Sequence, residues 1–175
     1  MRPRIQSKPR VGVSACLLGQ PVRYDGDARP HAWICKVLPR HAQILPFCPE
    51  TGAGLTIPRP PVHLVQMPDG AVRALGVENP DLDVTGLLQA WSLQQKQLLQ
   101  SLDALVLKSR SPSCGLETTP LFDPEGVLLK SNHDGIYAAW VKTHYPELLL
   151  CDELQLEETA DQVLFLDKLQ KKSRQ

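Results

Sequence analysis

Three cysteines in this chain come at, or shortly after, the ends of apolar segments that we predict to be buried strands. Cys16 ends the run VGVSAC, Cys48 ends the run AQILPFC, and Cys114 lies six residues after the run DALVLK, within the segment SRSPSCG. Neighbouring strands of a sheet lie about 5 Å apart, and the carboxyl ends of parallel strands meet at one edge. We therefore expect the three thiols to converge on a single point at that edge.

Three converging thiolates are suited to a soft metal centre. A structural zinc ion usually takes four protein ligands, and here the fourth would have to be Glu50 or a histidine. Iron–sulfur clusters also take Cys thiolates, and a four-iron cluster held by only three of them would keep one iron open as a Lewis acid. The simpler alternative for each cysteine is an inert core residue. We assign that role to Cys35 and Cys151, because neither lies among loop residues.

The segments that would position these thiols alternate between strands and helices. The predicted strands cover residues 11–16, 42–48, 103–108 and 147–151, and the predicted helices cover residues 31–38, 79–102, 133–146 and 160–172. This alternation is typical of an α/β protein, here a single domain with a mainly parallel, Rossmann-like sheet flanked by helices. Two further runs joined by PDG, at residues 62–76, predict a small β-hairpin insertion. We assign residues 11–175 to this domain and residues 1–10 to a flexible basic arm.

The composition disfavours several kinds of partner. Lys plus Arg and Asp plus Glu both number 19, so the formal net charge is zero and no overall field attracts nucleic acid or a membrane surface. A large RNA partner is disfavoured but stays open, because residues 1–10 are basic. No apolar run approaches the ~20 residues of a membrane span. The five cysteines contain no C-x-x-C pair, and we expect reduced thiols in a cytoplasmic protein.

Several short motifs occur in order along roughly residues 10–155. They are VSACLLG, VRYDG, FCPE, PRPP, DVT, LKSRSPSCG and DGIYAAWVK. In this combination the sequence resembles a family of small bacterial proteins, long described as a domain of unknown function, that includes the thiouracil desulfurases. The resemblance implies a hydrolytic, non-redox reaction in which a thiouracil loses its sulfur, becomes uracil and releases sulfide.

The resemblance also implies the cofactor and the catalytic residues. A [4Fe–4S] cluster would be held by the three cysteines of the motifs, Cys16, Cys48 and Cys114, with the fourth iron open to bind the thiocarbonyl sulfur. Glu50 is the implied proton carrier, and its alternative role is to cap a turn or a helix. A serine near the third cysteine is also implied. Candidates for this serine are Ser109, Ser111 and Ser113, and the motif does not choose among them.

The candidate substrate-binding residues are Arg23, Tyr24, Asp25, Gly26 and Lys108. Tyr24 could stack on a pyrimidine and Asp25 could accept a hydrogen bond from its ring N–H. The alternative is an ordinary turn in which the Asp25 side chain binds the backbone. Lys108 and Arg110 flank the Cys114 loop, where they could offset the charge of a cluster, hold a phosphate, or pair with surface acids. Arg59, in the motif PRPP, has the same open role.

Two other functions stay open at this point. One is a non-catalytic protein that binds a [4Fe–4S] cluster or another metal centre, as a sulfur carrier or a redox sensor. The other is a metal-free cysteine hydrolase, which needs a base beside one thiol, and the sequence shows no Cys/His pairing. For the leading function, the substrate is a small thiopyrimidine base, a nucleotide, or a thiouridine in tRNA.

Overall fold

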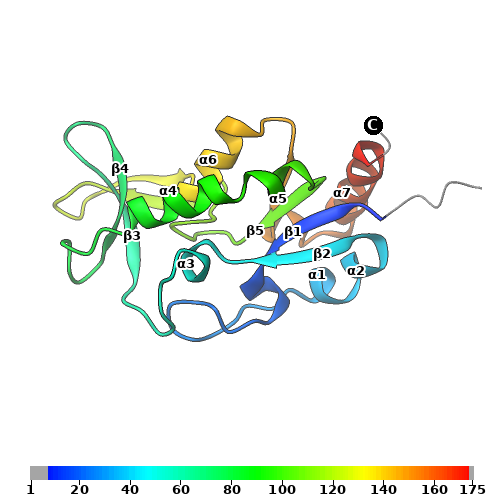
Figure 1. The fold of residues 1–175 in the computed structure, drawn as a ribbon, viewed down its shortest axis with the longest axis horizontal. Coiled ribbons are helices and arrows are strands. Elements are labelled where there is room, and N and C mark those ends of the chain that lie inside the picture. The colour runs from blue at the N-terminus through cyan, green and yellow to red at the C-terminus, as the bar shows by residue number, and fades with distance from the viewer. Residues whose placement is uncertain (1–7, 174–175) are drawn as a thin grey trace, which may run out of the picture.

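The computed structural model describes residues 8–173, so most of the predicted basic arm lies outside the described residues. Its central element is a four-stranded parallel sheet with strand order β2-β1-β5-β8 (Figure 1). The strands are β1 (Arg10–Ser14), β2 (Gln43–Phe47), β5 (Ala104–Leu107) and β8 (Leu149–Asp152). The four strands predicted from the apolar runs are therefore present, and the parallel α/β architecture is confirmed.

Packing explains how each of these strands forms. The side chains of β5 are all buried, and alternate ones enter two different hydrophobic clusters, as expected of a central strand covered on both faces. Gly12 in β1 permits close packing, because a Cβ there would lie 2.5 Å from the Leu105 side chain. Pro46 does not interrupt β2, since β2 is an edge strand and loses no interior hydrogen bond to proline.

Helices cover both faces of the parallel sheet. One face packs against α1 (Ala32–Lys36), α2 (Leu38–His41) and α7 (Thr159–Lys172), and the other against α4 (Thr85–Gln94), α5 (Lys96–Gln100) and α6 (Ile136–His144). The helix predicted over residues 31–38 is divided into α1 and α2 at Val37. Pro39 starts α2 instead of ending a helix, because a proline in the first turn costs no intrahelical hydrogen bond.

A second four-stranded sheet, which the sequence analysis predicted only in part, lies at one end of the molecule (Figure 1). Its strands are β3 (Val62–Gln66), β4 (Val72–Gly76), β6 (Thr119–Phe122) and β7 (Leu128–His133), in the order β4-β3-β6-β7. The predicted hairpin is β3–β4, and it is half of this sheet rather than a separate insertion. The sequences of β6 and β7 showed no clear strand pattern. For β7 the reason is that it is an edge strand whose first five residues are exposed.

The second sheet has its own small core, which joins it to the helices. Leu64, Ala74 and Leu121 from the strands pack with Val84 and Leu88 at the start of α4. From there α4 runs toward the parallel sheet (Figure 1). The described residues contain no helix with the length and apolar character needed to cross a membrane.

Candidate active site

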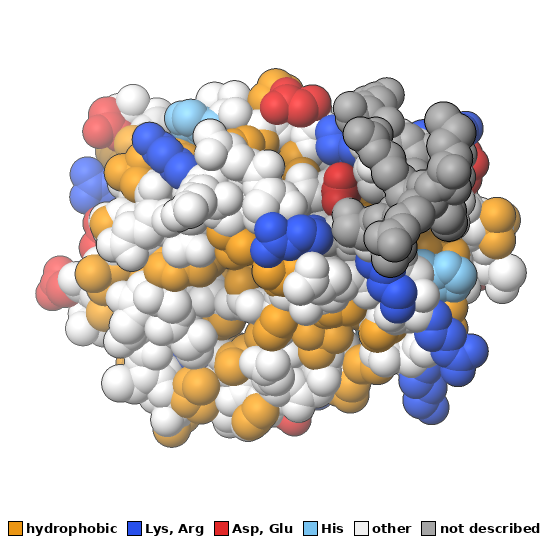
Figure 2. Space-filling view, turned by 45° about the vertical axis from the view of Figure 1, so that its right-hand side comes forward, with side chains coloured by type: hydrophobic (Ala, Val, Ile, Leu, Met, Phe, Trp, Pro, Cys, Tyr) orange, Lys and Arg blue, Asp and Glu red, His pale blue; other side chains and the backbone are white. Residues whose placement is uncertain are grey.

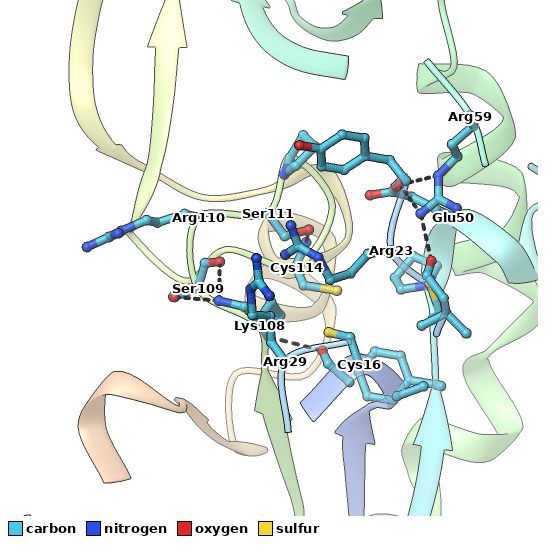
Figure 3. A pocket seen from close by; sticks show the side chains of 18 residues that line it. Cys16, Arg23, Arg29, Glu50, Arg59, Lys108, Ser109, Arg110, Ser111 and Cys114 are labelled. Atoms are coloured by element: carbon cyan, nitrogen blue, oxygen red, sulfur yellow. Dashed lines mark hydrogen bonds and ion pairs between the residues drawn. The ribbon is translucent and has the colours of Figure 1, made fainter. Parts of the chain in front are cut away.

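A pocket of about 380 Å³ lies at the carboxyl ends of β1, β2 and β5. Ligands of parallel α/β sheets commonly bind there, in the loops that follow the strands. The chain continues from these strands into η1 (Ala15–Leu18), α3 (Pro49–Gly52) and the loop 108–118, respectively. The volume is in the range of small-molecule sites. Figure 3 shows the 18 residues that line the pocket.

Cys16, Cys48 and Cys114 all line this pocket. Cys16 and Cys114 are 7% and 4% exposed, and their sulfur atoms point toward one another in Figure 3. Burial and the neighbouring Cys48 raise the pKa of Cys16 to about 11, and burial with both other thiols raises the pKa of Cys114 well above its ordinary value. The three groups are therefore close enough to repel one another as thiolates, and a cationic centre between them would remove that repulsion.

The other two cysteines lie away from the pocket. The Cys35 thiol donates a hydrogen bond to the Leu17 carbonyl at 3.3 Å. Cys151 is buried among the apolar side chains between the sheet and α7, where burial raises its pKa. Neither residue lines the pocket; Cys151 occupies the core position assigned to it from the sequence, whereas Cys35 is partly exposed.

The thiols that line the pocket are donors of the kind that iron–sulfur clusters take. Within residues 8–173, no group of three or more His, Cys, Asp or Glu side chains is arranged to hold a metal ion. A four-iron cluster requires a different arrangement, because each cysteine binds a different iron and the thiols stay apart. Three thiols around one small-molecule pocket, two of them buried and that of Cys48 partly exposed, fit such a cluster, and the cationic side chains of Arg23 and Lys108 lie near Cys16.

Glu50 lies in the first turn of α3, and its carboxylate lines the pocket beside Arg59 (Figure 3). Its Oε2 accepts a hydrogen bond from Arg59 Nε at 2.7 Å and forms an ion-pair contact with Arg59 Nη2 at 2.6 Å. Its Oε1 accepts a hydrogen bond from the fully buried Ser113 hydroxyl at 2.9 Å. The recorded partners of the carboxylate are thus side chains from other segments rather than a helix end.

Ser111 organises the loop that carries Cys114. Its Oγ accepts hydrogen bonds from the backbone N–H groups of Ser113 at 3.2 Å and Cys114 at 3.0 Å. The start of α6 adds two further bonds, from Ile136 N to Pro112 O and from Tyr137 N to Ser113 O. These contacts give the DGIY motif a structural role, because the first residues of α6 fix the cysteine loop.

Glycine is required where α6 approaches this loop. A Cβ on Gly135 would lie 2.5 Å from the Ser113 carbonyl carbon and 2.6 Å from its oxygen. Both are backbone atoms that cannot rotate away. Arg110 and Glu117, at the two sides of the loop, have positive φ angles of 58° and 54°, which non-glycine residues seldom adopt. Tertiary contacts therefore impose the shape of the loop.

Glu153 is a buried partner of the site that the sequence analysis missed. Its carboxylate accepts hydrogen bonds from Ser109 N at 2.8 Å and Ser109 Oγ at 2.6 Å, and it pairs with Lys108 Nζ. Burial alone would raise the pKa of Glu153, but these donors outweigh burial and lower it. Glu153 directly follows β8, the strand next to β5. Its position at the carboxyl end of a strand could have identified it from the sequence, as the same position identified the cysteines.

The segment 23–26 is only partly at the pocket. Arg23 and Tyr24 line it, with the Arg23 guanidinium 5.6 Å from the centre of the Tyr24 ring. Asp25 and Gly26 do not line it. The Asp25 carboxylate pairs with Arg23 at 3.1 Å and accepts a hydrogen bond from Asp27 N at 3.1 Å, and the hydrogen bond from Arg23 lowers its pKa. These contacts favour the turn alternative for Asp25.

Comparison with known proteins agrees with the motifs and the geometry. The family model for 2-thiouracil desulfurase matches residues 11–153, which include the three pocket cysteines, Glu50 and the serine-rich loop. The solved structure of a [4Fe–4S]-dependent thiouracil desulfidase is similar, with a TM-score of 0.68 and 32% identity over 90% of this chain and 99% of that chain. No match was found among curated proteins. The chain therefore belongs to the 2-thiouracil desulfurase family, as the resemblance in its sequence predicts.

Proposed function

We propose that this protein removes sulfur from a thiolated pyrimidine of the thiouracil type in an iron–sulfur-dependent, non-redox reaction. The family and the name of the similar solved structure support this activity. The observation that carries the proposal is that three thiols and one carboxylate, from three different strand ends, open onto one small-molecule pocket. In the reaction, water supplies the oxygen that replaces sulfur, its two protons leave with the sulfide, and no electrons are exchanged.

Cys16, Cys48 and Cys114 would hold the cluster. With a fourth iron that has no protein ligand, a [4Fe–4S] cluster supplies a thiophilic Lewis acid that polarises the carbon–sulfur bond. Lys108 and Arg23 lie close enough to Cys16 to lower its pKa against the effect of burial, and so they favour its thiolate form. The same cations offset the negative charge that three thiolates bring into the pocket.

The chain supplies a proton carrier beside the cysteines. Glu50 faces the pocket, and its carboxylate is oriented by Arg59 and Ser113 through three short contacts. Two of these contacts reach Oε2 and one reaches Oε1, so Oε1 retains a lone pair for a proton. A carboxylate fixed in this way can take a proton from the attacking water and return it to the leaving sulfur.

Hydrogen bonding favours Ser111 as the acting serine. The Ser109 hydroxyl donates to Glu153, and the Ser113 hydroxyl donates to Glu50. Ser111 Oγ only accepts hydrogen bonds, and within the described residues no acceptor is recorded for its own hydrogen. Because Ser111 lines the pocket, its hydroxyl is available to donate to the substrate or to the water.

Replacing Ser111 by alanine should lower kcat by about 10²-fold, as expected for the loss of one positioned donor. Ser109→Ala should lower it much less, because that hydroxyl is already bound to Glu153. Ser111→Thr, which keeps the oxygen that the loop amides need, should restore most of the rate. Steady-state kinetics at matched iron content measure the difference, and an equal loss in Ser109→Ala and Ser111→Ala would contradict this choice of serine.

We propose a small molecule as the substrate, held under Tyr24 and beside Lys108 at the pocket. Tyr24 lines the pocket and is 42% exposed, so its ring can stack on a base. The formal net charge is zero and the Lys and Arg side chains on the face in Figure 2 form several groups, so a large RNA is not the substrate that we propose. All five cysteines are free, in agreement with a cytoplasmic location.

The proposed function is tested by anaerobic reconstitution of the cluster followed by incubation with 2-thiouracil, 4-thiouracil and the corresponding thiouridines. We expect one sulfide and one oxo-base for each thiobase consumed, with no added reductant. Protein without the cluster should release none. If protein with an intact cluster releases no sulfide from any of these compounds, the proposal is wrong. A change of cluster oxidation state without sulfide would then favour the sensor alternative.

A further inference from the structure

Arg59, whose role the sequence left open, is more deeply buried than the pocket cations Arg23 and Lys108. It lies between Pro58 and Pro60, so the φ angles of both neighbours are fixed. Its side chain is 6% exposed and that of its partner Glu50 is 12% exposed. By contrast, the other ion pairs of Arg with Asp or Glu recorded within residues 8–173 have arginine side chains at least 22% exposed.

The guanidinium of Arg59 joins two segments that are separate in the fold. Nε donates to Glu50 Oε2, Nη2 forms an ion-pair contact with the same oxygen, and Nη2 donates to the Val22 carbonyl oxygen at 3.0 Å. Nη1 donates to the Thr56 carbonyl oxygen at 3.2 Å, which fixes the side chain to its own segment. The backbone N–H of Arg59 donates to the Tyr24 carbonyl oxygen at 2.9 Å. Arg59 thus connects the carboxylate to the segment 22–24.

The segment that Arg59 holds is irregular, and its other recorded backbone hydrogen bonds to residues outside it lie at its two ends, from Gln20 N to Ala15 O and from Arg29 N to Cys16 O. Residues 20–30 contain no helix or strand, and the side-chain ion pairs within them are exposed. They carry Arg23 and Tyr24 to the pocket. The hydrogen bonds from Arg59 to Val22 and Tyr24 therefore position the residues proposed to contact the base, while the hydrogen bonds to Glu50 position the proposed proton carrier.

We propose that Arg59 is a positioning residue that fixes the Glu50 carboxylate and the base-binding segment 22–24 relative to one another. This role rests on the proposed function, because it needs Glu50 and Tyr24 to act on the same substrate. The planar guanidinium is suited to it, since Nε can donate to the carboxylate while Nη1 and Nη2 donate to two carbonyls in fixed directions. A lysine ammonium keeps the positive charge but lacks the planar set of N–H groups that donate in fixed directions.

The test compares Arg59→Met and Arg59→Lys with Arg73→Met, which removes an exposed arginine–carboxylate pair on the second sheet. With the cluster reconstituted, Arg59→Met should lower kcat by about 10²-fold, the size expected when a reacting group is misplaced by about 1 Å. It should also raise KM, because Tyr24 is less well held. Arg59→Lys should recover most of kcat and leave KM raised. Arg73→Met should match the wild-type protein in both constants.

Two measurements without substrate complete the test. Iron and labile sulfide content should be unchanged in Arg59→Met, because the cysteines hold the cluster. Hydrogen exchange at residues 20–30 should be faster in Arg59→Met than in the wild type or in Arg73→Met. Unchanged kinetic constants and exchange in Arg59→Met, or loss of the cluster in both Arg59 variants, would overturn the proposal. Absence of sulfide release in the wild-type protein would instead overturn the proposed function, and faster exchange would still be measurable.

Discussion

Replacing Cys16, Cys48 or Cys114 by serine is expected to abolish binding of the [4Fe–4S] cluster. Each of these thiols lines the same pocket, and each comes from the end of a different strand, so no neighbouring cysteine can take its place. A serine hydroxyl is a hard oxygen donor and a poor ligand for iron–sulfur clusters, which select soft thiolates. Removing one thiol leaves two ligands on a centre that already has one open iron, and sulfide release is lost with the cluster.

The matched controls are Cys35→Ser and Cys151→Ser. Cys35 donates to the Leu17 carbonyl, and Cys151 is buried in the apolar cluster between the sheet and α7, so neither should change cluster content. Iron and labile sulfide per chain, together with the visible absorbance of the anaerobic protein, measure the outcome in all five variants. Equal cluster content in the five variants would refute the ligand set, and loss of the cluster in Cys35→Ser would place a fourth cysteine near it.

The place of the thiols could be predicted because it depends only on apolar runs that can be recognised in the sequence. The apolar runs before Cys16 and Cys48, and the run that ends shortly before Cys114, are strands of one parallel sheet. Their carboxyl ends meet at one edge whatever the loops do in detail. Errors of one or two residues in the strand ends did not matter, although β1 stops at Ser14 and Cys16 lies in η1.

The partners of the side chains that we propose as catalytic could not be predicted in the same way. Arg59 and Glu50 are nine residues apart, while Ser113 and Glu50 are 63 apart, and no periodic pattern connects them. Glu153 meets Ser109 across 44 residues, only because β8 lies beside β5. Choosing among the three serines likewise required hydrogen bonds that depend on the folded loop. Reactive side chains that follow strand ends could be found in the sequence. The hydrogen bonds and ion pairs that orient those side chains could not.

Replacing Glu50 by glutamine is expected to keep the cluster and to remove most of the turnover. Glutamine has nearly the same shape and can still accept a hydrogen bond from Ser113, so the cysteine loop should keep its conformation. An amide cannot carry the proton, and kcat should fall by about 10³-fold, within the range for loss of a general acid–base group. Steady-state sulfide release at matched iron content is the measurement, with the exposed Glu157→Gln as control.

Stability separates this chemical role from a structural one. Glu50→Gln leaves the buried Arg59 cation without its counter-charge, which should lower the free energy of unfolding by about 2 kcal/mol. The double variant Glu50→Gln/Arg59→Met removes both charges and should recover part of that stability, since a neutral pair carries no desolvated charge. It should recover none of the activity. Turnover at the wild-type rate in Glu50→Gln would remove Glu50 from the mechanism, and recovery of turnover in the double variant would show that the lone cation, rather than the missing carboxylate, had inhibited the reaction.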